Sequence, residues 1–88
     1  MRESDWEILD SLQKTGNITN TARLLCLSQS AVTKRVQKME SDLGVRILSR
    51  TSKGVALTPA GEYLAGKAAE HRAFMERIRK DLGEMQDP

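Results

Sequence analysis

Residues 28–44 read SQSAVTKRVQKMESDLG, and this stretch decides the fold. Ser28 is a favoured N-cap residue, and Gly44 is typical of the position at which a helix ends. Apolar side chains recur at spacings of four, three and four, which places them on one face of a helix. These residues are Val32, Val36, Met39 and Leu43. The sequence therefore predicts an amphipathic helix over about 28–43, with this face in the core.

The opposite face of this helix is polar and carries no acidic residue. Its side chains are Gln29, Ser30, Thr33, Lys34, Gln37 and Ser41. A merely solvated face usually mixes Glu with Lys. Amides and hydroxyls can instead donate to and accept from base edges in the major groove of DNA, and lysine reaches phosphates or guanine. The composition of this face therefore indicates contact with DNA.

Two shorter helices are predicted upstream. Ser4 with Glu7 forms a capping-box pattern, so a first helix should begin there and carry Trp6, Leu9 and Leu12 on its apolar face.

Gly16 and Asn17 should end this first helix, and Thr19 is the expected cap of a second helix of about two turns. Ala22 and Leu25 would face the core from it. A short helix, a turn and a longer helix with a polar outer face form a helix-turn-helix arrangement.

The pattern changes to a hairpin after Gly44. Residues 45–50 and 55–57 are short segments with β-branched side chains, and turn-forming residues separate them. The sequence predicts a two-stranded wing at about 46–57. Lys53 at its tip is in a position to enter the minor groove or to meet a phosphate.

A long helix should follow the wing, because Thr58 is a cap and Pro59 suits the first helical position. It should continue to about Met85. Apolar residues and one histidine alternate at spacings of four and three, which is a heptad seam. They are Leu64, Ala68, His71, Met75, Ile78, Leu82 and Met85. Some 26 helical residues span about 40 Å, more than a small domain covers, so the seam predicts pairing with a second copy. In the alternative, the helix folds back on its own domain; we expect this only for the first turns, around Ala60 and Tyr63.

Together these elements predict a mainly α fold with a small β-hairpin. Residues 1–58 would form a winged helix-turn-helix domain, with a three-helix core and a two-stranded wing. Residues 59–88 would form the linker and dimerisation helix.

The positive charge is concentrated in one segment. Residues 34–53 contain six basic and two acidic residues, a net charge of +4, so the rest of the chain carries −2 of the total of +2. A surface that binds a polyanion needs such a concentration, because neutralised phosphates release counterions. A solvated basic face would carry the same charge, so charge alone leaves both interpretations open. Arg35 points away from the polar face, and we assign it to an ion pair with Glu40 or Asp42.

Several classes of function lack support in the sequence. One cysteine, Cys26, and one histidine, His71, provide neither an internal disulfide nor a metal site. No acid pair, nucleophile with a base or phosphate-binding glycine loop is present, so we do not expect an enzyme. No apolar run approaches the roughly 20 residues of a membrane span, and residues 1–5 do not resemble a signal peptide. We therefore expect a cytoplasmic protein without membrane contact.

Taken together, these features resemble the N-terminal DNA-binding domain, with its linker helix, of the LysR-type transcriptional regulators. The resemblance rests on residues 16–19, Ala22 and Leu25, residues 28–33, Met39-Glu40, Leu43-Gly44, Arg50 and residues 57–61. Members of the family usually have proline at Ser30 and phenylalanine at Leu48. These two departures bear on sequence preference and wing packing rather than on the fold.

The resemblance implies how the domain works. Family members are dimers or tetramers whose linker helices pair and whose third helices enter successive major grooves of an imperfect palindrome, while their wings reach the minor groove. The implied base-reading residues are Gln29, Ser30, Thr33 and Lys34. The implied contacts to the DNA backbone or minor groove are Thr19, Ser28, Lys38, Arg50, Ser52 and Lys53.

Family proteins also carry a larger C-terminal domain that binds a small effector. This sequence ends before such a domain, so we expect no cofactor in this chain and a small-molecule effector for the missing part. Two other interpretations stay open. One is a winged helix that binds proteins rather than DNA, and the other is a winged-helix regulator of the molybdate-responsive type.

Overall fold

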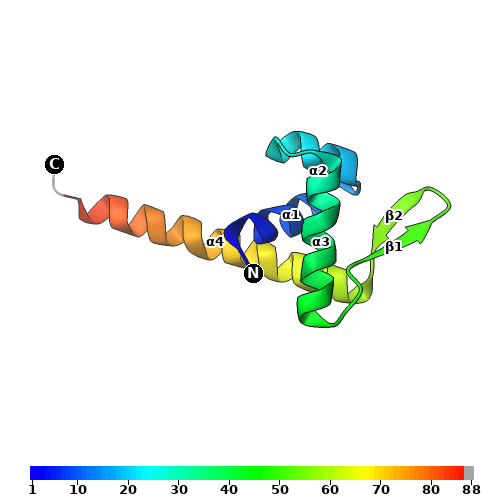
Figure 1. Cartoon of the computed structure of the whole chain (residues 1–88). Coiled ribbons are helices and arrows are strands. Elements are labelled where there is room, and N and C mark those ends of the chain that lie inside the picture. Colours follow the sequence, from blue (N-terminus) through cyan, green and yellow to red (C-terminus); the bar gives the residue numbers. More distant parts are fainter. Residues whose placement is uncertain (87–88) are drawn as a thin grey trace.

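The computed structural model describes residues 1–86 and confirms the predicted fold class. Three helices are followed by a hairpin and a long helix: α1 (Glu3–Thr15), α2 (Ile18–Leu25), α3 (Gln29–Leu43), β1 (Leu48–Thr51), β2 (Gly54–Leu57) and α4 (Pro59–Met85). Helices α1 to α3 gather at one end of the molecule, and α4 extends away from them (Figure 1). The predicted linker range also includes Asp87 and Pro88, which lie outside the described residues. None of the helices within residues 1–86 has both the length and the apolar character needed to cross a membrane.

The core lies where the three short helices meet the first half of α4. Its buried apolar residues are Ile8, Leu9, Leu12, Ala22, Val32, Val36, Met39, Ile47, Ala65 and Ala68. Three of the four core positions predicted for α3 are confirmed. The fourth, Leu43, is 44% exposed, because Ile47, just beyond the turn at Gly44, enters the core at this end instead.

The starts of α1 and α2 differ from the prediction. Helix α1 begins at Glu3 rather than Ser4, and the Asp5 carboxylate, not Glu7, accepts the backbone N–H of Arg2 at 2.9 Å. Helix α2 is capped by Asn17, whose side chain accepts the backbone N–H of Asn20 at 2.6 Å. Both cap assignments were wrong by a few residues, because several polar residues near a helix start can serve as the cap.

Helix α3 and the hairpin follow the sequence closely. Ser28 caps α3 by accepting the backbone N–H of Ala31 at 3.0 Å, and Gly44 ends it with a φ of 69°. Strands β1 and β2 pair antiparallel from Leu48↔Leu57 to Thr51↔Gly54. The first strand starts at Leu48 rather than near Val45, because the N–H of Ile47 bonds to the Glu40 side chain instead of to the sheet.

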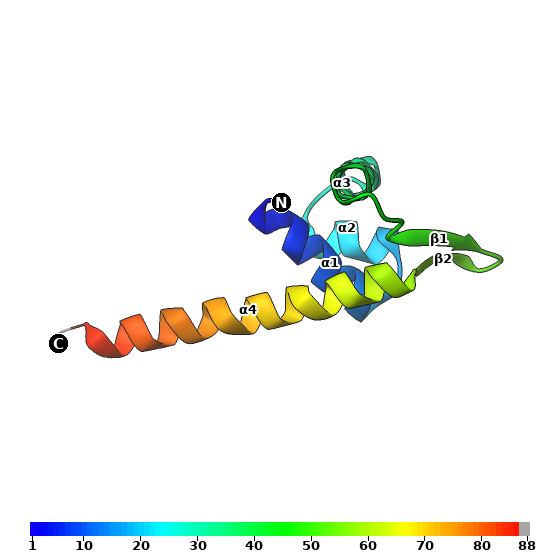
Figure 2. The ribbon, with the colours of Figure 1, turned by 90° about the horizontal axis from the view of Figure 1, so that it is seen from below.

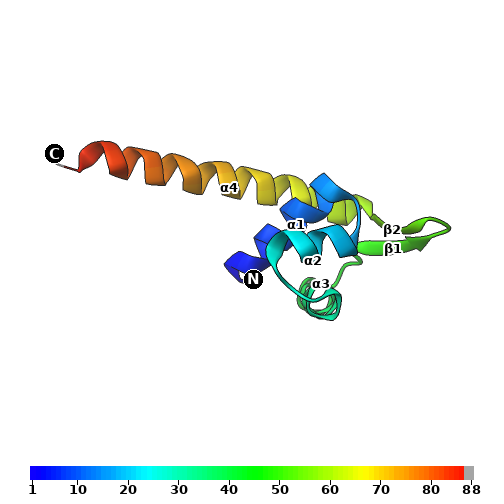
Figure 3. The same cartoon turned by 90° about the horizontal axis from the view of Figure 1, so that it is seen from above.

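Helix α4 folds back on its own domain farther than expected. It lies beside α1, as seen from below and from above (Figures 2 and 3). Arg72 Nε lies 3.1 Å from Asp10 Oδ2, and His71 Nε2 lies 3.0 Å from Glu3 Oε2. The fold-back therefore reaches about Arg72, whereas Tyr63, expected to pack on the domain, is 65% exposed.

The first three positions of the predicted dimer seam contact the chain's own domain. Ala68 is buried in the chain's own core, Leu64 packs against that core, and His71 lies against Trp6 with the ring centroids 5.4 Å apart. The physical reason is that Ala65 and Ala68 have small side chains, which let α1 approach α4 closely. Met75 is half-buried and lines a pocket with Trp6 and His71, and the seam lies beyond these contacts from Ile78 onward.

Candidate nucleic-acid interface

The polar face of α3 points outward. Helices α1 and α2 lie between α3 and α4 in Figures 2 and 3, so the outer side of α3 is turned away from the long helix. Gln29, Ser30 and Lys34 are exposed and Thr33 is half-buried. The four residues predicted to read bases therefore share one open surface in the first two turns of α3.

The wing stands beside this face. Arg50, Ser52 and Lys53 are exposed. The backbone N–H of Lys53 donates to Thr51 Oγ1 at 3.2 Å and stabilises the turn at the tip. A groove of about 140 Å³ separates α3 from the hairpin, with Thr33 and Gln37 on one side and Ser49 and Arg50 on the other. Its walls thus join the two predicted sets of residues into one surface.

The remaining predicted contact residues flank this surface. Thr19 is exposed in the first turn of α2, next to Ile18, which lines the groove. The hydroxyl of Ser28 is engaged as the cap of α3. Lys38 forms an ion pair with Asp42 at 3.1 Å, but both side chains are more than half exposed. Because exposed pairs contribute little free energy, Lys38 remains available to a phosphate.

Arg35 is paired with Asp5 of α1, not with Glu40 or Asp42 as the sequence suggested. Its Nε donates to Asp5 Oδ1 at 2.9 Å and its Nη2 to Asp5 Oδ2 at 2.7 Å. Burial by itself would raise the pKa of the Asp5 carboxyl. The hydrogen bonds from Arg35 and from the backbone N–H of Arg2 outweigh it and hold that pKa below its ordinary value. This bidentate pair fixes the middle of α3 to α1.

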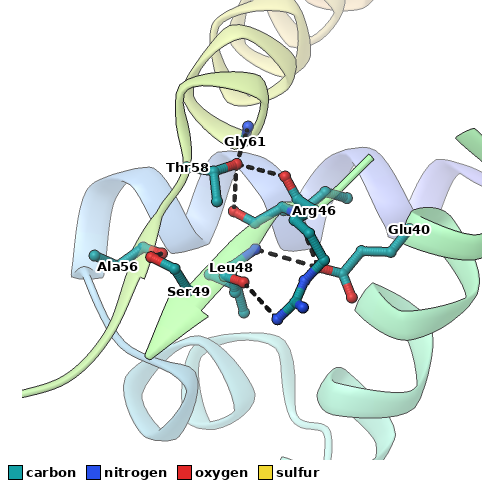
Figure 4. A network of polar contacts seen from close by, with 8 residues as sticks. Glu40, Arg46, Leu48, Ser49, Ala56, Thr58 and Gly61 are labelled. Atoms are coloured by element: carbon teal, nitrogen blue, oxygen red, sulfur yellow. Dashed lines mark hydrogen bonds and ion pairs between the residues drawn. The ribbon is translucent and has the colours of Figure 1, made fainter. Parts of the chain in front are cut away.

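The base of the wing is held by residues that no sequence pattern marks as functional. The Glu40 carboxylate accepts the N–H groups of Ile47 and Leu48 and lies 3.6 Å from Arg46 Nε (Figure 4). From the other side, Thr58 Oγ1 donates to the carbonyl of Arg46 and accepts the N–H of Gly61 (Figure 4). No periodic pattern marks Glu40, because its partners lie beyond a turn.

The distal part of α4 carries large apolar residues that its own domain does not cover. Phe74 is 64% exposed, Leu82 57% and Met85 76%, with Ile78 half-buried between them. Phe74 was absent from the predicted seam because it falls outside the four-three spacing. These four residues, which we call the distal stripe, lie near one another on one side of the helix.

The comparisons with known proteins agree with this geometry. A family model described as "Bacterial regulatory helix-turn-helix protein, lysR family" matches residues 4–62. The HTH-type transcriptional regulator YofA of Bacillus subtilis is 34% identical over 88 residues, which cover 100% of this chain and 31% of YofA. The uncharacterised HTH-type transcriptional regulator YbhD of Escherichia coli is 42% identical over 59 residues, covering 67% of this chain and 19% of YbhD. The chain thus spans about a third of the length of YofA and less of YbhD.

Two solved structures share the fold over nearly the whole chain. The DNA-binding domain of CbnR in complex with DNA is 27% identical, with a TM-score of 0.86 and coverage of 97% of this chain and 98% of that one. The DNA-binding domain of BenM with catB site 1 DNA has a TM-score of 0.88 at 21% identity, with coverage of 97% and 96%.

Proposed function

The chain belongs to the LysR family of bacterial regulatory helix-turn-helix proteins, and from that premise we propose that it binds specific double-stranded DNA sequences as part of a transcription regulator. In this proposal α3 lies in the major groove and the wing reaches the neighbouring minor groove. The observation that carries it is the open polar surface of the first two turns of α3, residues 29–36, which carries no acidic residue and lies beside a basic wing. In this proposal the protein recognises DNA without catalysing a reaction, and it acts in the cytoplasm.

The proposed contacts divide by their chemistry. Gln29, Ser30, Thr33 and Lys34 read base edges, because they are the side chains on the open face near the start of α3. Thr19, Ser28, Lys38, Arg50, Ser52 and Lys53 hold the backbone or the minor groove. A glutamine whose amide oxygen accepts from adenine N6 while its NH2 donates to adenine N7 is the most selective of these contacts.

We also propose that two copies pair through the distal stripe of α4. Phe74, Leu82 and Met85 of the distal stripe are exposed and Ile78 is half-buried. A second copy would cover this apolar surface, which gives a homodimer on an imperfect palindrome. The full-length protein would be a dimer or a tetramer. Within a longer protein such as YofA, of which this chain spans about a third, a small-molecule effector would act through the remainder.

Replacing Gln29 with alanine tests base reading. We expect Gln29→Ala to weaken binding to a selected cognate duplex by about 2 kcal/mol, or about thirtyfold, with little effect on random duplex. Lys53→Ala should weaken both complexes similarly, because a phosphate or groove contact of lysine carries little sequence information. Fluorescence anisotropy at fixed salt measures both, after cognate sites have been selected from random duplexes.

The matched control is Gln13→Ala, which removes an exposed glutamine from α1 and should leave both affinities unchanged. Equal losses on cognate and random duplex for Gln29→Ala would argue against base reading by this face.

Placing a charge in the distal stripe tests dimerisation. We expect Leu82→Glu to raise the dissociation constant of the homodimer by at least about tenfold, because an exposed apolar contact is replaced by a charge that must be desolvated. Sedimentation of the free protein measures it. Ala73→Glu is the control, because this exposed residue lies about 100° around the helix from Phe74. If both variants dimerise like the wild type, the distal stripe is not the interface.

A role in binding protein rather than DNA is the second candidate. Leu24 is 62% exposed and Leu27 38% exposed at the turn between α2 and α3, and such apolar side chains favour contact with protein. Salt separates the two functions, because the affinity for DNA falls log-linearly with salt concentration while an apolar contact hardly responds.

A further inference from the structure

Glu40 is an acidic residue in the surface that we propose binds DNA, where a negative charge is unfavourable. It lies between the basic residues of α3 and the wing and lines the groove that separates them. Its carboxylate would repel a nearby phosphate. Glu40 is also about 16 Å along the helix axis from Gln29, so it is remote from the proposed base-reading residues. A contact with bases therefore does not account for it.

The hydrogen bonds of Glu40 reach the first residues of the wing. The carboxylate oxygen Oε2 accepts the N–H of Ile47 at 2.7 Å and the N–H of Leu48 at 3.3 Å. Ile47 is fully buried and Leu48 begins β1. Since the side chain of Glu40 is only 18% exposed, these bonds are shielded from water and fix the direction in which the strand leaves the domain.

The start of helix α4 holds Ile47 from the side opposite Glu40. The carbonyl of Ile47 accepts the backbone N–H of Thr58 at 2.9 Å, and Thr58 is the cap of α4. Both ends of the hairpin are therefore tied together at Ile47, and Glu40 links them to α3. Figure 4 shows Glu40 and Thr58 on either side of this junction.

Beyond Leu48 and Leu57, which pack against the core, the wing has little to hold it. Residues 49–54 are all exposed, and a two-stranded hairpin alone is marginally stable in water. Lys53 lies five residues from Leu48, about 16 Å along a strand. A tilt of about 10° at the base would move the tip by about 3 Å, which is enough to lose a hydrogen bond.

We propose that Glu40 is a positioning residue for the wing: it sets the angle between α3 and the hairpin so that Lys53 and Arg50 meet DNA while α3 occupies the major groove. This inference rests on the proposed DNA-binding function. Glu40 acts through the backbone of Ile47 and Leu48 and does not itself touch DNA.

Removing the charge of Glu40 is a sharp test, because a positioning role and simple electrostatics predict opposite changes in the affinity for DNA. Glu40→Gln and Asp42→Asn each remove one negative charge from α3, and Asp42 bonds only to Lys38 among residues 1–86. Electrostatics alone would make both variants bind DNA more tightly. We expect Asp42→Asn to bind equally well or more tightly, Glu40→Gln to bind about threefold more weakly, and Glu40→Ala about tenfold more weakly. Tighter binding by Glu40→Gln would overturn the inference.

A double-mutant cycle with Lys53 shows whether Glu40 acts through the wing. We expect Lys53→Ala to cost about fivefold in affinity in the wild-type background and less than about twofold when Glu40 is glutamine or alanine. Gln29→Ala should keep its full effect in the same backgrounds, which a general loss of structure would not allow. Thermal unfolding shows whether each variant is folded at the assay temperature. If Glu40→Ala is unfolded there, the cycle is measured with Glu40→Gln alone.

The outcomes distinguish the inference from the proposed function. An unchanged effect of Lys53→Ala in the Glu40 variants overturns the positioning role and leaves DNA binding by the wing intact. A loss of the Gln29→Ala effect would mean that α3 itself has moved, which also overturns it. If Lys53→Ala has no effect in the wild-type protein, the wing contact of the proposed function fails, and the positioning role fails with it.

Discussion

A Gly61→Ala variant should lose about 3 kcal/mol of its free energy of unfolding, the upper end of what overpacking costs. A methyl group on Gly61 would collide with the backbone carbonyl oxygen of Ile47 and lie 3.1 Å from Leu57 Cδ2. A flexible side chain could move away, but the Ile47 carbonyl is held by the N–H of Thr58. The first turn of α4 must therefore shift away from the base of the wing. Denaturant unfolding followed by circular dichroism measures the loss, which is a large part of the 5–15 kcal/mol typical of a small domain.

The same substitution at Gly66 is the control, with the opposite expected sign. Gly66 lies in the same helix, and an added methyl group there would meet nothing within 4 Å. Because alanine favours helix by up to about 1 kcal/mol over glycine, Gly66→Ala should be neutral or stabilising. If Gly61→Ala were as stable as Gly66→Ala, the close approach of α4 to Ile47 would not exist in solution.

Arg35→Met is expected to cost about 3 kcal/mol of unfolding free energy at neutral pH. The change leaves the Asp5 carboxylate, only 1% exposed, without its cationic partner. Breaking a buried pair in this way costs about 3–5 kcal/mol, and we take the lower end because the side chain of Arg35 is 25% exposed. The control is Arg77→Met, whose exposed pair with Asp81 should contribute less than about 1 kcal/mol. Equal stability of the two variants would mean that the Asp5 pair contributes no more than a surface contact.

Acid should reduce the difference in unfolding free energy between wild type and Arg35→Met. Because the folded-state pKa of Asp5 lies below the ordinary value of 3.8, the pair stabilises the fold above that pH. The stabilisation is lost as the pH falls through the lowered pKa. The gap in unfolding free energy between wild type and Arg35→Met should therefore narrow as the solution is acidified below about pH 4. A gap that stays constant down to pH 2 would indicate that lost packing of the arginine stem, rather than its charge, explains the cost.

Much of the fold was predictable because its signals are local. Ser28 and Gly44 bound α3, Thr58 with Pro59 starts α4, and turn-forming residues mark the tip of the wing. The outward face of α3 also followed from a single helical period. Each of these features depends on residues within a few positions of one another, so the backbone preferences of the chain are sufficient to determine them.

Contacts between distant segments were decided only by the tertiary structure. Arg35 was assigned to neighbours on its own helix, yet its partner is 30 residues away on α1, and the bonds of Glu40 cross a turn. The four-three spacing in α4 predicted a buried stripe but not what buries it. Leu64 and Ala68 cover the chain's own core, while Leu82 and Met85 remain exposed. The physical reason is that an apolar stripe has the same periodicity whether its own domain or a second copy covers it, so only the path of the chain in space distinguishes the two.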